Sequence, residues 1–342
     1  MLTKRREEMA QTGYGASEVG TIAGLNKYST PIKLFEKRVY GIKEQETSLP
    51  AELGSLLEEP LAKKFAADTG LHLVKSATLR HRVHTYGLCI ATPDRIAFVE
   101  RRTTKAQVNE PEECDAACAN VQIKTASMWE RRAWGESGTD AIPLSYLAQV
   151  QWEMAATGLK KTFVPVLFDK AEYAVFEVGF DEDLFGRLYE LVERFHVDHV
   201  LAKVPPVVDA SDDYGDFLFN RFGAGVAKKY REVEAGSFAE TKVLRYRELK
   251  TIEKETAEEL KKLGYMLRGA IGDDKGLSGS FGQVSWGRGP GKPSTDWEAL
   301  AKAVVNDPAK LTELTKQHQK MGAVFDQIRT RWAKQDTNEE EG

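Results

Sequence analysis

Asp94 and the segment Gln122-Ile123-Lys124 constrain the fold of this chain more than any other feature. Short apolar runs at both places predict strands. Side chains two residues apart on a strand leave the same face of a sheet, so Gln122 and Lys124 are expected to share a face. If the strand beside Asp94 pairs with the strand of Lys124, three polar groups converge on one point of the sheet.

The order of the predicted elements indicates an α/β (α+β) fold, with a central mixed β-sheet flanked by helices. Strands are predicted at 71–74, 88–91, 96–100, 121–124, 163–168 and 172–178, and helices at 31–40, 52–69, 144–157 and 181–203. A polar, acidic interruption makes residues 101–119 the expected site of an inserted loop.

The last third of the chain differs in character. Residues 229–270 are heavily charged and periodic, which predicts a long helix or a helical hairpin, followed by a short strand at 283–286. Two or three short helices are expected between Trp297 and Trp332. We therefore expect two domains, residues 1–206 and a mostly helical extension over 207–342.

Composition limits the setting in which the chain works. Of its 342 residues 42% are hydrophobic, enough for a substantial core, and no apolar run approaches the roughly 18 residues of a membrane span. The net charge of −4 is not typical of a nucleic-acid-binding protein, but it is compatible with a locally basic site. Three cysteines cannot form a disulfide framework, so a soluble, reducing, cytoplasmic protein is expected.

The Asp94, Gln122 and Lys124 pattern resembles the active site of the PD-(D/E)xK nucleases. The resemblance implies a Mg²⁺ site made by Asp94, Gln122 and the backbone carbonyl of Ile123, with Mn²⁺ expected to substitute. It also implies that Lys124 orients or deprotonates the water that attacks a phosphodiester. A turn aspartate beside an ordinary polar edge strand gives the same short pattern, so other parts of the chain must decide.

Three further segments match in order along the chain. The helix segment Gly54–Glu58 resembles a Gly-x-x-x-Glu helix whose glutamate faces the metal. The segment Tyr146–Trp152 resembles a downstream helix whose glutamine, here Gln149, contacts the scissile phosphate or the nucleophilic water. The turn Gly15-Ala16-Ser17 resembles one whose serine binds a DNA 5′-phosphate together with an upstream arginine, for which Arg5 and Arg6 are the candidates. A solvated glutamate and a capping loop are the plain alternatives for the first and the third.

The chain is thus identified as similar to the YqaJ-like viral recombinases, relatives of lambda exonuclease, over about residues 13–205. This implies a restriction-endonuclease-like core and a Mg²⁺-dependent deoxyribonuclease of the alkaline-exonuclease type. Such an enzyme digests one strand of linear double-stranded DNA from 5′ to 3′ and leaves 3′ overhangs for a single-strand annealing protein. The resemblance further implies a homotrimeric ring and recombination of phage or mobile-element DNA in the cytoplasm of a bacterial host.

One departure from the family pattern and one rival within the superfamily keep alternatives open. Most members carry an acid where this chain has Gln122, so Glu58 and Asp94 are left as the two formal charges of the metal site. A catalytically weak DNA-end-binding scaffold therefore stays possible beside the exonuclease. Another nuclease of the superfamily, an endonuclease or a single-strand-specific, Cas4-like enzyme, is the other alternative. No iron–sulfur cluster is expected, because such relatives use four cysteines and this chain has only Cys89, Cys114 and Cys118.

Overall fold

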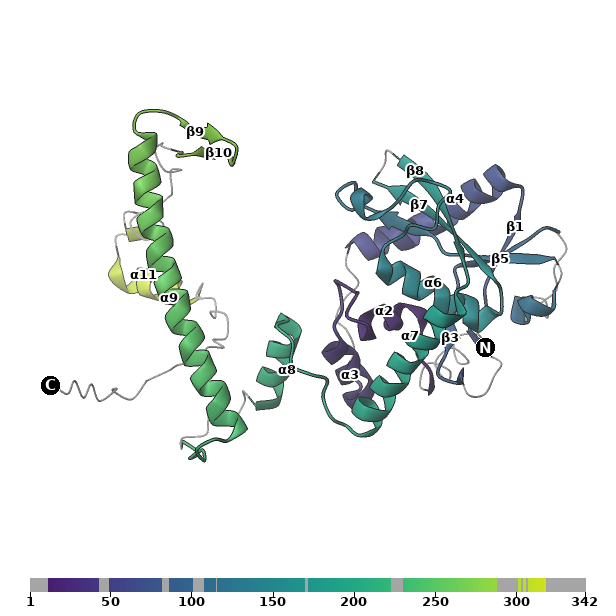
Figure 1. Ribbon diagram of the computed structural model, residues 1–342, viewed down its shortest axis with the longest axis horizontal. Helices are drawn as coiled ribbons and strands as arrows, with labels where there is room; N and C mark the ends of the chain where they lie inside the picture. The colour runs from purple at the N-terminus through teal and green to yellow at the C-terminus, as the bar shows by residue number, and fades with distance from the viewer. Residues whose placement is uncertain are drawn as a thin grey trace. The chain divides into compact units, whose positions relative to one another are not determined.

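The computed structural model describes residues 12–42, 49–81, 86–100, 108–114, 116–169, 172–222, 230–287, 301–302, 304–305 and 307–317. The chain divides into two compact units, residues 1–224 and 225–342 (Figure 1). Helix α8 (Asp212–Phe222) belongs to the first unit, where Tyr214 and Phe217 are buried. The helix thus lies in the first unit although residue 207 was the expected start of the extension.

The first unit is built on a six-stranded mixed sheet, which confirms the predicted fold class. The strand order is β1-β4-β5-β7-β6, with β8 paired to β7. The strands are β1 (His72–Lys75), β4 (Arg95–Phe98), β5 (Ala117–Val121), β6 (Lys124–Ala126), β7 (Lys161–Phe168) and β8 (Glu172–Gly179). Strands β5 and β6 both run parallel to β7, whereas β1, β4 and β8 pair antiparallel with their neighbours.

Two long helices cover the two faces of this sheet (Figure 1). Helix α4 (Leu49–Thr69) packs Leu61 and Phe65 against a cluster that includes Val121 and Phe163. Helix α6 (Leu144–Thr157) packs against the alternate residues of β7, which are Val164, Val166 and Phe168. Side chains of β7 thus alternate between the two faces, with Phe163 in the α4 cluster, so the sheet lies between two helical layers.

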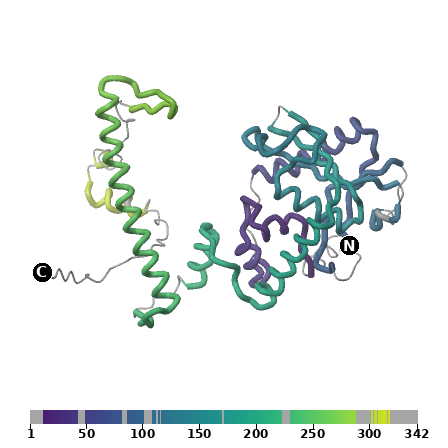
Figure 2. The backbone as a smooth tube through the Cα atoms, viewed as in Figure 1, coloured from purple at the N-terminus to yellow at the C-terminus, as the bar shows by residue number. Residues whose placement is uncertain are grey.

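Further helices pack around α6. They are α2 (Ala16–Ile22), α3 (Pro31–Tyr40) and α7 (Glu182–Arg194), which continues into the π-helical segment η4 (Phe195–Leu201). The purple helices α2 and α3 pack on each other, α2 also against α7 and α3 against η4 (Figure 1, Figure 2). The chain enters this cluster at Gly13, where a Cβ would lie 2.8 Å from Ile90 Cγ2, so only glycine fits without a shift.

The second unit is described by its elements alone. Helix α9 (Phe238–Ile271) is one continuous 34-residue helix, so the prediction of a long helix is confirmed and the hairpin alternative is wrong. A hairpin of β9 (Gly276–Gly279) and β10 (Gly282–Ser285) follows. Helix α11 (Pro308–Gln317) falls within the expected Trp297–Trp332 helices, most of which lie outside the described residues.

Three predictions about strands require correction. Residues 121–124 do not form one strand, because β5 ends at Val121 and β6 begins at Lys124. The expected insertion at 101–119 includes part of a sheet strand, since β5 begins at Ala117; residues 101–107 lie outside the described chain. The expected strand 88–91 shrinks to β3 (Ile90–Ala91), which pairs with β2 (Leu79–Arg80) apart from the central sheet. Within the described residues no helix is long and apolar enough to cross a membrane.

Candidate active site

Asp94 sits directly before β4 and joins the interruption between β5 and β6. Its Oδ2 accepts a 2.8 Å hydrogen bond from the backbone N–H of Ile123. The backbone N–H of Asp94 approaches Oε1 of Gln122 at 3.4 Å. These contacts explain why 121–124 is not one regular strand: Ile123 donates to a carboxylate while the N–H of Gln122 still donates to the carbonyl of Phe163 on β7 at 2.9 Å.

The structure therefore brings Asp94, Gln122 and Lys124 together, as the sequence predicted. The register places Arg95 opposite Val121, so the strand after Asp94 does pair beside the strand that carries Gln122. Burial raises the pKa of Asp94, and the nearby Lys124 and the hydrogen bond from Ile123 oppose that rise. A carboxylate that is largely enclosed and charged attracts a cation strongly.

Lys124 is held from α6 by a chain of two hydrogen bonds, which we call the lysine relay (Lys124, Gln149 and Glu153). Nζ of Lys124 donates to Oε1 of Gln149 at 3.0 Å, and Nε2 of Gln149 donates to Oε1 of Glu153 at 2.8 Å. The predicted role of Gln149 was a contact to phosphate or water. In this structure its side-chain oxygen accepts from Nζ of Lys124, so Gln149 holds the Lys124 side chain from helix α6.

The charge state of Lys124 is set by its surroundings. Burial lowers its pKa, and the carboxylates of Glu153 and Asp94 oppose that shift. The Tyr146 ring, also on α6, lies 4.9 Å from Nζ and offers its π face to the ammonium. An amine with a lowered pKa exchanges protons more readily near neutral pH than an ordinary lysine.

Glu153 is the member of the site that the sequence reading missed. Its side chain is almost fully buried, its Oε2 has no hydrogen-bond partner, and burial raises its pKa to about 8. The available signal was the spacing: Glu153 follows Gln149 by four residues on α6 and so shares its face. An acid enclosed by Trp152 and Met154 in sequence is also unusual for a solvated helix.

Glu58 lies on the α4 side of the site and is paired with a cation of the protein. Arg95, which is 4% exposed, binds Oε1 of Glu58 at 2.5 Å and Oε2 of Glu59 at 2.8 Å. The same guanidinium donates to the carbonyl of Asp94 at 2.6 Å. Both glutamates therefore reach the arginine that follows Asp94, although Glu59 is 54% exposed.

The predicted family implies a divalent metal ion, which would require oxygen donors at this site. Asp94, Glu58 and the amide oxygen of Gln122 are all hard oxygen donors, which is the kind that Mg²⁺ prefers. Among the described residues no cluster of three or more His, Cys, Asp and Glu side chains could hold a metal ion. The third donor here is an amide, so the set fits a hard cation with two formal charges instead of three.

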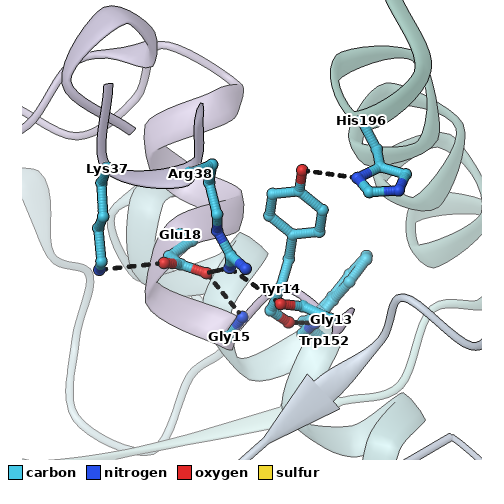
Figure 3. Close-up of polar contacts among 8 residues, drawn as sticks. All are labelled: Gly13, Tyr14, Gly15, Glu18, Lys37, Arg38, Trp152 and His196. Carbon is cyan, nitrogen blue, oxygen red and sulfur yellow. Dashed lines mark hydrogen bonds and ion pairs between the residues drawn. The ribbon is translucent and has the colours of Figure 1, made fainter. Parts of the chain in front are cut away.

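The expected 5′-phosphate site is only partly assembled in the described residues. Ser17 is exposed in the first turn of α2, and Arg5 and Arg6 lie outside the described chain. Figure 3 shows the turn itself: Oε2 of Glu18 accepts from the N–H of Gly15 at 3.0 Å, and Arg38 of α3 pairs with Glu18 and donates to the carbonyl of Gly13 at 2.9 Å. The Gly15 N–H is thus already used within the turn.

The same turn is anchored to α6 and η4. The indole Nε1 of Trp152 donates to the carbonyl of Tyr14 at 2.9 Å, and the Tyr14 hydroxyl is 3.0 Å from Nδ1 of His196 (Figure 3). Burial raises the pKa of Tyr14 to about 12 and lowers that of His196. These contacts fix residues 13–17 against the helix that carries the lysine relay.

Comparison with known proteins now identifies the family. Residues 5–160 match the model of the YqaJ-like viral recombinase domain. These residues are similar to that domain. The YqaJ-like chain is 26% identical over 279 residues to the uncharacterized protein YqaJ of Bacillus subtilis (strain 168), which covers 80% of each of the two chains. The predicted family is confirmed.

Solved structures show weaker likeness to the YqaJ-like chain. The alkaline exonuclease LHK-Exo from Laribacter hongkongensis aligns with 64% of this chain and 98% of its own, at 18% identity and a TM-score of 0.42. A phage-related exonuclease from Haemophilus somnus 129PT aligns with 56% of this chain and 96% of its own, at 12% identity and a TM-score of 0.39.

Proposed function

We propose that this YqaJ-like chain is a metal-dependent exonuclease. It digests one strand of linear double-stranded DNA from 5′ to 3′ by phosphodiester hydrolysis. The remaining 3′ overhang loads a single-strand annealing protein for homologous recombination of phage or mobile-element DNA. We further propose a homotrimeric ring that acts in the bacterial cytoplasm.

The convergence of Asp94 and Lys124 is the observation that supports this proposal most. Asp94 directly precedes β4 and Lys124 begins β6, two strands that are not adjacent in the sheet, yet the 2.8 Å hydrogen bond from the N–H of Ile123 to Asp94 joins the two segments. A buried carboxylate and an amine of lowered pKa then face the same space. Phosphodiester hydrolysis needs such a pairing of cation-binding oxygens with a group that manages the proton of water.

Asp94, Gln122 and Glu58 would hold the metal, together with the carbonyl of Ile123. Bound Mg²⁺ supplies Lewis-acid activation of phosphate and acidifies water. Lys124 orients the attacking water through Nζ and takes its proton. Gln149 keeps Nζ aimed at that position because its Oε1 accepts from Nζ and its Nε2 is fixed by Glu153. The guanidinium of Arg95 donates to both Glu58 and the backbone carbonyl of Asp94 and so holds them in place.

A second candidate function is DNA-end binding with little catalysis. Gln122 contributes no charge, and the guanidinium of Arg95 already neutralises part of Glu58. Weak metal binding would leave a protein that grips DNA ends but hydrolyses them slowly. The two candidates differ in turnover and agree in their preference for ends.

Digestion of matched DNA forms tests the proposal. Linear duplex with 5′-phosphates, the same duplex without them, nicked circle and closed circle are incubated with Mg²⁺, and 5′- and 3′-labelled strands are followed separately. We expect mononucleotides from the 5′ end of the phosphorylated linear form and no cutting of the closed circle. Loss of the 3′ label first would reverse the proposed polarity, and cutting of the circle would favour an endonuclease. End binding without any release would favour the second candidate.

A further inference from the structure

Two aromatic side chains stand in solvent beside the candidate active site. Trp129 is 94% exposed, and it lies in the turn that directly follows β6, five residues after Lys124. Tyr28 is 75% exposed. Large aromatic rings usually bury most of their surface, so a tryptophan this open beside a catalytic strand indicates a binding role.

The turn that carries Trp129 is fixed by hydrogen bonds on both sides of the ring. The N–H of Glu130 donates to the carbonyl of Ser127 at 3.0 Å, and the N–H of Arg131 donates to that of Met128 at 3.2 Å. The N–H of Met128 also donates to Oδ2 of Asp169 at 2.9 Å. The backbone therefore presents the indole at a defined place, although the ring itself gains little burial there.

An ion pair connects this turn with the segment of Tyr28. Lys27 pairs with Glu130, the residue after Trp129, and Nζ of Lys27 lies 4.8 Å from the Tyr28 ring. The pair neutralises a carboxylate that would otherwise repel phosphate. Arg132 is exposed in the same turn region and adds a positive charge.

The same groups border the catalytic lysine through Tyr146. The Tyr146 ring faces Lys124 at 4.9 Å. Burial raises the pKa of Tyr146, and Glu130, Tyr28 and Lys27 are its next electrostatic neighbours. Tyr28 and the residue after Trp129, Glu130, therefore lie near the tyrosine that contacts Lys124.

We propose that Trp129, assisted by Tyr28, is a stacking site for unpaired nucleobases of the DNA strand next to the scissile phosphate. Every base has a π face, so stacking holds a strand without reading its sequence. The inference rests on the proposed nuclease function and adds the chemical group that this rim recognises.

Binding of single-stranded oligonucleotides in EDTA tests the site without turnover. Wild type is compared with Trp129→Ala, Trp129→Phe and Tyr28→Ala, and with Phe222→Ala as a matched control that removes a 66% exposed ring from α8. We expect Trp129→Ala to weaken binding about tenfold, within the range of one lost stack. We expect Trp129→Phe to stay within about threefold of wild type and Phe222→Ala to change nothing.

Two further readouts separate stacking from a structural effect. An oligonucleotide of equal charge with abasic residues at the terminal positions should bind wild type and Trp129→Ala equally. Oligonucleotide should quench tryptophan emission in wild type and do so less in Trp129→Phe, although that variant still binds. In digestion, Trp129→Ala should raise KM more than it lowers kcat.

Three outcomes would overturn the stacking site. Trp129→Ala could bind as tightly as wild type, it could lose affinity equally for normal and abasic strands, or it could change the mass in solution, which would make Trp129 a subunit contact. A wild type that neither binds nor cleaves DNA would instead remove the proposed function itself. A wild type that cleaves while Trp129→Ala is unaffected removes only the stacking site.

Discussion

The two sides of the candidate active site are built differently. On the α6 side, Lys124, Gln149 and Glu153 form a closed relay beneath a buried helix. On the α4 side, Glu58 is 33% exposed and is shared with Arg95, while Gln122 stands where an acid is expected. The α6 side is thus preorganised by packing, whereas the α4 side depends on a bound cation for its charge balance.

The two sides should therefore affect catalysis differently, one through the pKa of buried groups and the other through metal affinity. Burial is the largest cause of the pKa shifts of Glu153 and Lys124, and salt screens buried groups less than exposed ones. The charge count of the oxygen donors sets metal affinity on the other side. Substitutions on the α6 side should therefore change kcat, and those on the α4 side should change the metal concentration that is required.

Asp94→Asn should have the largest effect, because it removes the charge of a proposed metal ligand that also accepts the hydrogen bond from Ile123. An asparagine oxygen still accepts from Ile123, so the fold should be kept. We expect mononucleotide release to fall by about 10³-fold, the upper range for one catalytic electrostatic group. Single-turnover digestion measures this, with circular dichroism as the check on folding. Activity within tenfold of wild type would contradict the assignment of Asp94.

Glu153→Leu should come next and tests whether the relay matters. The change leaves Nε2 of Gln149 without its partner, so Lys124 loses its fixed direction. We expect kcat to fall by about 10–100-fold, typical of groups that orient catalytic residues. Glu153→Gln should retain most activity, because its amide oxygen can still accept from Gln149.

Stability separates this prediction from simple unfolding. Removing one member of a buried polar set leaves its partner unsatisfied, which costs stability. The melting temperature of Glu153→Leu should therefore fall, and kcat should fall as well when it is measured far below that temperature. A variant that melts lower and has unchanged kcat would make Glu153 purely structural.

These side chains also show what the sequence could and could not predict. Two strand patterns and a two-residue spacing predicted that Asp94, Gln122 and Lys124 lie together. They do lie together, but residues 122–123 are not part of a strand, and the hydrogen bond from Ile123 to Asp94 joins the segments instead. The α6 boundaries at Leu144 and Thr157 agree with the expected helix. The resemblance in motif order predicted the same residues.

The missed features depend on tertiary contacts that leave no local pattern. The break between β5 and β6 arises because Ile123 donates to Asp94, a residue 29 positions away. Arg95 reads as part of a strand, yet its guanidinium collects Glu58 and Glu59 from another helix. Only the spacing of Gln149 and Glu153 carried a local signal for a partner of the relay.

Gln122→Glu sharpens the contrast from the α4 side. An added carboxylate beside Asp94 gives the site a third formal charge, and we expect Mg²⁺ to bind about tenfold more tightly. Calorimetric titration with Mg²⁺ measures this, and Gln283→Glu on the exposed strand β10 controls for net charge. The saturating kcat should change little. A tighter Mg²⁺ affinity in the control as well would assign the effect to the overall field.

The smallest effect concerns pH and stability. The folded pKa of Glu153, about 8, lies above its ordinary value of 4.5. The folded state therefore holds a proton that the unfolded state has lost between those values, so stability falls as pH rises through this window and levels off above it. The slope is at most about 1.4 kcal/mol per pH unit. Glu153→Gln should flatten the urea-unfolding free energy between pH 5 and about 8 relative to wild type. Parallel curves for both proteins would contradict the raised pKa.

Lys124→Met tests whether Lys124 acts in hydrolysis, because methionine is unbranched, approximates the aliphatic stem of lysine and lacks the amine. Release of mononucleotides from a 5′-phosphorylated linear duplex is measured at saturating Mg²⁺ for wild type and variant, with end binding measured in parallel. We expect wild type to release mononucleotides rapidly and Lys124→Met to release them about 10²–10³-fold more slowly, with end binding retained. Equal rates for the two proteins would contradict it, because a site that hydrolyses DNA without Lys124 is not the one assembled by Asp94, Gln122 and the lysine relay.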